Sequence, residues 1–143
     1  MHITISEGIR SILIVEDEAL VSLMMEEIVR EMGARQVQVY ANLEGASVAA
    51  EQTLFDCAIL DLSVRGGLTD AVADILDRRG IPFIFSTASN RDAVPGRHRD
   101  RPIIMKPFAE DDFRMLLLDT CRDWTAPCAE AVGARVASAV ATD

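Results

Sequence analysis

The sequence predicts an α/β fold in which helices cover both faces of a doubly wound, five-stranded parallel sheet. The first observation is that strand-like apolar runs alternate five times with helix-like segments. The second is that these runs are short and apolar almost throughout, as in strands buried on both faces. The third is size, because 143 residues, 50% of them hydrophobic, suffice for one domain with a substantial core.

The first strand and helix follow an N-terminal extension at residues 1–10. Residues 11–15 (Ser-Ile-Leu-Ile-Val) are partly β-branched and run directly into two acids, which predicts a buried strand. Residues 18–32 carry apolar side chains at helical spacing, and Gly33 provides a natural stop for that helix. Residues 37–40 then predict a second, shorter strand.

The middle of the chain repeats the same alternation. Residues 43–54 are rich in alanine and are expected to be helical. Residues 56–60 predict a third buried strand, which also ends in an acid, Asp61. A loop is expected at Gly66-Gly67, and residues 68–79 again show helical spacing.

The last part of the predicted domain contains two strands, one doubtful segment and one helix. Residues 81–85 predict the fourth strand and residues 103–105 a very short fifth one. Between them, residues 90–101 hold six charged residues and few apolar ones, so we expect a mobile loop with at most a turn or two. His98 in this loop is expected to be solvated, and residues 110–124 to be helical.

Composition excludes several classes of protein. The formal net charge of −9 argues against sequence-independent binding of nucleic acid, which depends on neutralising phosphates. No apolar run reaches the roughly 20 residues of a membrane-spanning helix, and the start lacks the layout of a signal peptide. Three cysteines without CxxC spacing argue against a disulfide framework or a zinc site. A cytoplasmic protein with reduced thiols is the expectation.

Polar side chains follow the predicted strands at one edge of the sheet. Glu16 and Asp17 follow the first strand, Asp61 the third, Thr87 the fourth and Lys106 the fifth. If the first and third strands are neighbours, three carboxylates converge, and they need a counter-charge such as Mg²⁺. A hydroxyl and an ammonium there would hold phosphoryl oxygens. Each residue alone also fits an ordinary role as a cap or solvated side chain, but their combination at this edge favours a site.

In these motifs the chain resembles the receiver domain of two-component response regulators. The matching runs are residues 12–17 (Ile-Leu-Ile-Val-Glu-Asp), 58–62 (Ala-Ile-Leu-Asp-Leu), 85–88 (Phe-Ser-Thr-Ala) and 105–108 (Met-Lys-Pro-Phe). The resemblance covers residues 11–124 and implies a flavodoxin-like or CheY-like fold with strand order 2-1-3-4-5. Residues 125–143 are then expected to form a flexible C-terminal tail.

The resemblance also implies roles for the residues at the sheet edge. It implies that Asp61 accepts a phosphoryl group from the phosphohistidine of a sensor histidine kinase. It implies that Asp17 and Asp61 bind Mg²⁺ directly, together with the backbone carbonyl of Ser63, and that Glu16 acts through water. The residues that would contact the bound phosphoryl group are Thr87 and Lys106.

One position departs from the usual receiver pattern. Receivers normally carry a switching Tyr or Phe three residues before the lysine, and this chain has Ile103 there. The region from residue 82 to 108 resembles the FATGUY group of receivers, which lack that aromatic residue, although Ser86, Ala88 and Asn90 differ from its motif. Members of this group are typically paired with kinases of the HWE or HisKA2 type, often in alphaproteobacteria.

The expected function is that of a stand-alone response regulator and not of an enzyme. Only 143 − 124 = 19 residues follow Trp124, too few for a DNA-binding output domain, so output is expected through an unidentified protein partner, without nucleic acid or membrane. Three alternatives remain open. In these alternatives the chain is a phosphate sink for a kinase, an adaptor that works without phosphorylation, or a phosphohydrolase. The last usually needs a second acid two residues after the first, where Ser63 stands.

Overall fold

A five-stranded parallel sheet forms the centre of the protein in the computed structural model, which describes residues 10–89 and 91–131. The strands are β1 (Ser11–Val15), β2 (Gln36–Tyr40), β3 (Cys57–Asp61), β6 (Phe83–Thr87) and β7 (Ile103–Met105). Their order across the sheet is β2-β1-β3-β6-β7, and every neighbouring pair is parallel. The predicted fold and the strand order 2-1-3-4-5 are therefore confirmed.

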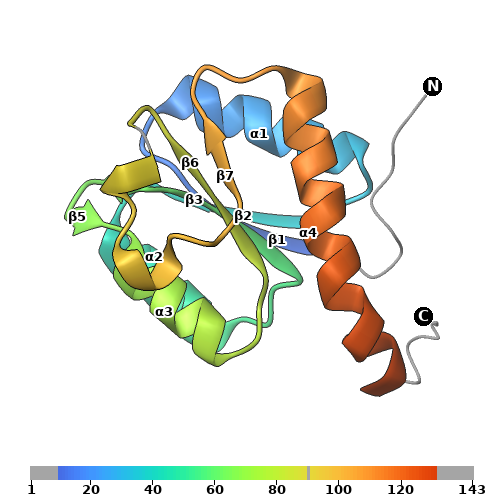
Figure 1. Cartoon of the computed structure of the whole chain (residues 1–143). Helices are drawn as coiled ribbons and strands as arrows, with labels where there is room; N and C mark the ends of the chain where they lie inside the picture. The colour runs from blue at the N-terminus through green and yellow to red at the C-terminus, as the bar shows by residue number, and fades with distance from the viewer. Residues whose placement is uncertain (1–9, 90, 132–143) are drawn as a thin grey trace.

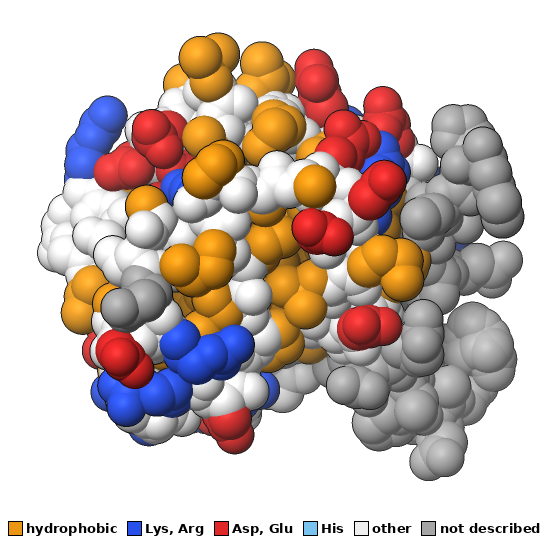
Figure 2. All heavy atoms as spheres, turned by 45° about the horizontal axis from the view of Figure 1, so that its top comes forward, with side chains coloured by type: hydrophobic (Ala, Val, Ile, Leu, Met, Phe, Trp, Pro, Cys, Tyr) orange, Lys and Arg blue, Asp and Glu red, His pale blue; other side chains and the backbone are white. Residues whose placement is uncertain are grey.

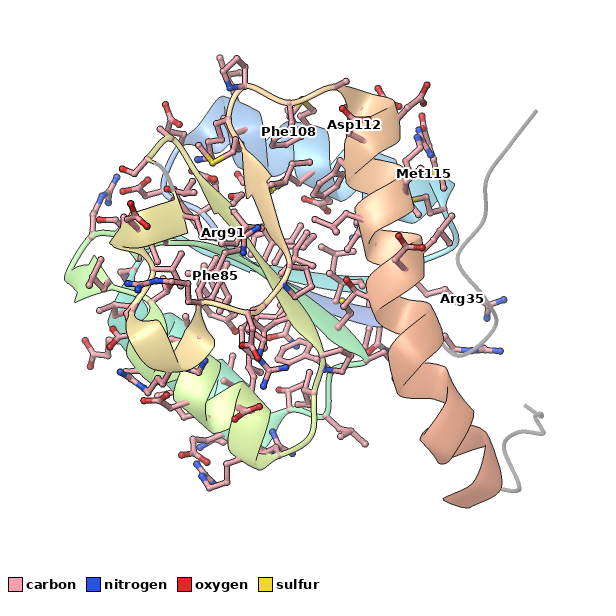
Figure 3. All side chains as sticks on the ribbon, in the orientation of Figure 1. Arg35, Phe85, Arg91, Phe108, Asp112 and Met115 are labelled. Carbon is pink, nitrogen blue, oxygen red and sulfur yellow. The ribbon has the colours of Figure 1, made fainter. Side chains whose placement is uncertain are left out.

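Helices cover both faces of this sheet (Figure 1). They are α1 (Ala19–Glu31), α2 (Leu43–Gln52), α3 (Asp70–Arg78) and α4 (Glu110–Ala131). The buried side chains of α1 and α4 belong to one hydrophobic cluster and those of α2 and α3 to another, on the opposite face. Figure 3 shows the two layers of side chains between the sheet and its helices.

The first strand shows why its sequence is apolar throughout. Ile12 and Ile14 pack toward α1 and α4, whereas Leu13 and Val15 pack toward α2 and α3. All four side chains are fully buried, and burying each contributes about 2 kcal/mol. A strand with helices on both sides cannot place polar side chains on either face, so it does not alternate.

Local signals fix the ends of the helices. Gly33 follows α1 with a φ of 114°, a backbone conformation that favours glycine, so the predicted stop is confirmed. Asn42 caps α2, because its side-chain oxygen accepts a hydrogen bond of 2.9 Å from the amide of Gly45. A glycine thus ends α1 and a capping asparagine begins α2, so the sequence itself marks these two helix ends.

Two elements differ from the predicted boundaries. A short hairpin, β4 (Ser63–Val64) and β5 (Gly67–Leu68), occupies the expected Gly-Gly loop, so α3 begins at Asp70 and not at residue 68. The helix α4 continues to Ala131, past the predicted helix end at residue 124, because the alanines in this stretch favour helix. The rest of the predicted tail, residues 132–143, and residues 1–9 lie outside the described part of the chain. Among the described residues, no helix is both long and apolar enough to cross a membrane.

The connection between β6 and β7 contains two short 3₁₀ helices, η1 (Arg91–Ala93) and η2 (Gly96–His98). This agrees with the prediction of at most a turn or two. Arg99 stabilises the connection internally, because its guanidinium donates to the carbonyl of Val94 at 2.8 Å. Val94 is fully buried, so the connection is anchored to the core despite its polar composition.

His98 is buried, which corrects the prediction that it is solvated. Only 2% of the residue is exposed, and its Nε2 lies 2.7 Å from Oδ1 of Asp74 on α3. Its ring packs edge-on against the rings of Phe83 and Phe85, with centroids 5.8 and 6.1 Å away. The burial of His98 could not be seen in the sequence, because its neighbours there are charged. One of them, Arg97, remains exposed and pairs with Asp74 outside the core.

Candidate functional site

The predicted acids converge at the carboxyl edge of the sheet. β1 and β3 are neighbours, with Val15 opposite Leu60, so the residues that follow, Glu16 and Asp61, lie next to each other. Glu16, Asp17 and Asp61 each offer a carboxylate oxygen within 4.8 Å of the others. Glu16 and Asp61 are buried and Asp17 is half-buried, so the cluster lies partly below the surface.

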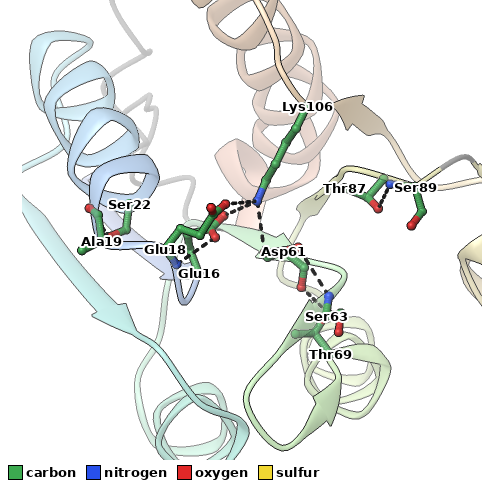
Figure 4. A network of polar contacts seen from close by, with 10 residues as sticks. All are labelled: Glu16, Glu18, Ala19, Ser22, Asp61, Ser63, Thr69, Thr87, Ser89 and Lys106. Atoms are coloured by element: carbon green, nitrogen blue, oxygen red, sulfur yellow. Dashed lines mark hydrogen bonds and ion pairs between the residues drawn. The ribbon is translucent and has the colours of Figure 1, made fainter.

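Lys106 reaches this cluster from the end of β7 (Figure 4). Its Nζ donates hydrogen bonds to Oε1 of Glu16 at 2.8 Å and to Oδ2 of Asp61 at 3.1 Å. A third carboxylate, Glu18, lies 3.7 Å from the same ammonium and was not predicted. The backbone fixes the lysine, because its amide donates to the carbonyl of Thr87 on β6 at 2.8 Å.

The ionisation of the buried pair reflects its surroundings. Burial raises the pKa of Glu16, and the charge of Asp61 adds to this, while the hydrogen bond from Lys106 opposes it. Burial alone would lower the pKa of Lys106, but its hydrogen bonds to Glu16 and Asp61 outweigh burial, and the pKa is raised. The cluster is therefore short of positive charge, although one ammonium already lies within it.

The remaining predicted residues line a hollow beside Asp61. The hollow has a volume of about 290 Å³, and Asp61, Ser63, Thr87 and Lys106 are among its lining residues. Thr87 is 3% exposed, and its hydroxyl accepts a hydrogen bond of 2.9 Å from the amide of Ser89. Figure 4 shows Thr87 apart from Asp61 and Lys106, and within the described residues no hydrogen bond joins its hydroxyl to either of them.

The sequence assigned no role at the site to two buried polar residues near it. Thr69 is fully buried and donates from its hydroxyl to the carbonyl of Asp61 at 2.7 Å. Ser86 lies opposite Asp61 on the neighbouring strand, and its hydroxyl is buried without a hydrogen-bond partner in the described structure. The available signal was a small hydroxyl residue inside or beside an apolar stretch, which sequence alone assigns to a cap or a core position.

The donor set fits a hard divalent cation. Carboxylate and carbonyl oxygens are the ligands that Mg²⁺ prefers, and the three acids supply more negative charge than Lys106 offsets. The residues that could hold the ion are Glu16, Asp17 and Asp61. The amide of Ser63 lies 3.4 Å from Oδ1 of Asp61, so this peptide segment lies against the carboxylate.

A doubly wound parallel sheet with these acids and a lysine at its carboxyl edge defines a receiver-type signalling module. No family model matches the chain. The solution structure of SdrG from Sphingomonas melonis Fr1 is 38% identical, with a TM-score of 0.69, covering 78% of this chain and 95% of SdrG. A structure of the BeF3-activated conformation of SdrG, from Pseudomonas melonis Fr1, is 39% identical with a TM-score of 0.63, covering 76% of this chain and 95% of that one.

A curated relative agrees with the structural neighbours. The transcriptional regulatory protein PdtaR of Mycobacterium tuberculosis is 36% identical over 109 residues, which are 72% of this chain and 52% of PdtaR. The chain thus spans about half the length of that relative. The chain belongs to the CheY-like receiver domains of response regulators. These are signalling proteins rather than enzymes, as the sequence predicted.

Proposed function

We propose that the chain is a phosphoacceptor in a phosphorelay and takes a phosphoryl group on Asp61 from a sensor histidine kinase. The position of Asp61 carries this proposal. Asp61 lies at the end of the middle strand, is 9% exposed as a residue, and lines the hollow of about 290 Å³. An ammonium on one side and a hydroxyl across the hollow provide donors for phosphoryl oxygens.

The transfer can be written for these residues. A carboxylate oxygen of Asp61 attacks the phosphorus of the phosphohistidine as the nitrogen–phosphorus bond breaks, and the imidazole leaves with the bonding electron pair. Lys106 offsets negative charge on the moving phosphoryl group. Mg²⁺ held by Glu16, Asp17, Asp61 and the Ser63 carbonyl would supply the remaining counter-charge. The attacking group is a carboxylate and has no proton to lose, so the step needs no general base.

The response to phosphorylation would begin at Thr87. The new phosphate brings negative charge and three acceptor oxygens, so the Thr87 hydroxyl would leave the Ser89 amide and turn into the hollow. The η1–η2 connection follows directly, so a movement at Thr87 would shift it. Ile103 stands where an aromatic switch is usual, which supports membership of the FATGUY group and a kinase of the HWE or HisKA2 type.

Output would occur through protein contacts at a cytoplasmic location. Figure 2 shows hydrophobic side chains gathered at the centre of one face, with a group of basic side chains at its lower left and a group of acidic ones at its upper right; charges of both signs also lie along its left edge. Exposed Met105 on β7 and Met115 on α4 are examples of hydrophobic side chains that the sheet and helices leave uncovered. A surface of this kind fits a downstream protein, whose identity the chain does not specify.

A small phosphodonor tests the assignment. With Mg²⁺ and acetyl phosphate, intact mass should show the gain of one phosphoryl group on the wild type and none on Asp61→Asn. Asp111→Asn is a matched control, because Asp111 is an exposed acid on α4. Labelling that survives in Asp61→Asn would refute the proposal.

The alternatives are distinguished by this reaction together with transfer from a kinase. An adaptor that works without phosphorylation, which the missing aromatic residue favours mildly, would gain no mass where a standard receiver is labelled. A phosphate sink would accept phosphate rapidly from its kinase and lose it without changing any partner's affinity. Transfer from labelled HWE, HisKA2 and other kinases then identifies the donor type.

A further inference from the structure

Thr69 is a buried polar residue beside the site, and its hydrogen bonds have no role in the phosphoryl transfer proposed above. It occupies the N-cap position of α3, where a threonine normally accepts a hydrogen bond from a helix amide. Its side chain makes no such bond. The hydroxyl instead turns back toward the sheet and donates to the carbonyl of Asp61 at 2.7 Å, with the carbonyl of Leu62 at 3.2 Å.

The backbone of Thr69 reaches the same segment. Its amide donates to the carbonyl of Leu62 at 2.9 Å, so side chain and main chain together hold the two peptide units that follow β3. The residue is fully buried, and a bond between buried groups is not replaced by water when it is lost. Thr69 therefore fixes the path of the chain from Asp61 into the β4–β5 hairpin.

The hairpin register shows what this path determines. One hydrogen bond, from the Thr69 amide to the Leu62 carbonyl, flanks the hairpin, whereas the Leu62 amide donates to the carbonyl of Ser86 on β6. A bond in that flanking position makes the adjacent pair, Ser63 and Leu68, a non-bonded one. The amide of Ser63 accordingly points away from the hairpin, toward Oδ1 of Asp61 at 3.4 Å. In an extended strand the amide and carbonyl of one residue point to the same side, which would direct the Ser63 carbonyl toward the acidic cluster as well.

We propose that Thr69 is a positioning residue for the magnesium site, because its hydroxyl holds the Asp61 and Leu62 peptides and so directs the Ser63 carbonyl toward the ion. This inference rests on the proposed function, since it concerns the cation that serves phosphoryl transfer. Thr69 does not touch the ion or the phosphoryl group. It acts through the backbone.

Isothermal titration with Mg²⁺ alone tests the inference on four proteins. Thr69→Val removes the hydroxyl and keeps the shape, and we expect it to weaken Mg²⁺ binding by about threefold to tenfold, the effect of one hydrogen bond. Thr69→Ser keeps the hydroxyl and should bind Mg²⁺ like the wild type. Thr120→Val is the matched control, because Thr120 is a buried threonine on α4 whose hydroxyl also donates to a backbone carbonyl, that of Leu116 at 2.8 Å.

A second measurement separates positioning from stability. The rise in Tm on adding Mg²⁺ reports affinity even in a destabilised variant, and Thr69→Ala replaces Thr69→Val if the latter does not fold. With acetyl phosphate, Thr69→Val should need more Mg²⁺ for half-maximal labelling but reach the wild-type rate at saturation. Normal Mg²⁺ affinity in Thr69→Val, or an equal loss in Thr120→Val, would overturn the inference.

These outcomes remain distinct from those of the proposed function. A wild type that binds Mg²⁺ in a Thr69-dependent way but is never phosphorylated would refute phosphoacceptor function and support the role of Thr69. A wild type that is labelled on Asp61 while Thr69→Val binds Mg²⁺ normally would do the reverse.

Discussion

Replacing Lys106 by methionine should destabilise the protein, and Mg²⁺ should reverse part of that loss. The ammonium lies 2.8 Å from a Glu16 oxygen and 3.1 Å from an Asp61 oxygen, and the three side chains are 14%, 0% and 12% exposed. Each contact corresponds to about 5 kcal/mol of attraction at an effective dielectric constant of about 20, largely offset by desolvation. Breaking a buried pair costs about 3–5 kcal/mol, and the adjoining hollow admits water, so we expect about 3 kcal/mol.

Differential scanning calorimetry with EDTA and with Mg²⁺ provides the assay. A loss of about 3 kcal/mol corresponds to a Tm lower by roughly 10 °C for a domain of this size. Mg²⁺ should narrow the gap, because a cation among the carboxylates replaces the lost charge. The control is Arg78→Met, whose 2.7 Å pair with Glu51 is exposed at 61% and 48%, so it should change stability by less than about 1 kcal/mol. If Lys106→Met loses no more stability than the control, the reasoning about the buried pair is wrong.

Three further variants test the surroundings of the site. His98→Ala should lower the free energy of unfolding by about 2–4 kcal/mol, measured in urea, because it empties a buried space between two phenylalanine rings and leaves Asp74 without that contact; a smaller loss than about 1 kcal/mol would contradict its burial. The hydrogen bond from Arg97 lowers the pKa of Asp74 to about 2 from 3.8. Burial of the carboxyl opposes this shift, and the hydrogen bond with His98 adds to it. The ionised Asp74 carboxylate therefore contributes its full stabilisation above about pH 4 and loses it as the pH falls through about 2. Asp74→Asn should lose less stability than the wild type over that window, by under about 1 kcal/mol because the side chain is half exposed. Equal losses in the two proteins would contradict the pairing. Ser86→Ala removes a buried hydroxyl that has no partner in the described structure and should leave stability unchanged or raise it by up to about 1 kcal/mol, and a clear loss of stability in urea would show that the hydroxyl is bonded.

The architecture was predictable because the local and the overall patterns agree. The runs that became β1 and β3 are apolar throughout, which only burial on both faces explains, and glycine marks the end of α1. Parallel strands then bring their carboxyl ends to one edge, so Glu16, Asp61 and Lys106 could be placed together before any distance was known.

The missed features depend on contacts between distant parts of the chain. His98 and Asp74 are 24 positions apart, and nothing local shows that an arginine-flanked histidine folds over β6. In the sequence Thr69 looks like an ordinary helix cap. Only the folded hairpin brings its hydroxyl within hydrogen-bond distance of the Asp61 carbonyl. Glu18 is exposed and lies at the start of α1, so only the reach of Lys106 connects it with the site.

The central place of β3 has a consequence for how fast different parts of the protein exchange hydrogen with solvent. β3 has two strands on each side, and all five of its residues are buried. Amides in such a strand exchange only when the whole domain opens, whereas those of the short 3₁₀ turns after β6 exchange by local opening. Asp61 thus lies on a strand whose amides exchange slowly, whereas Thr87 adjoins a segment whose amides exchange faster. Deuterium uptake can therefore separate local opening beside the site from unfolding of the domain.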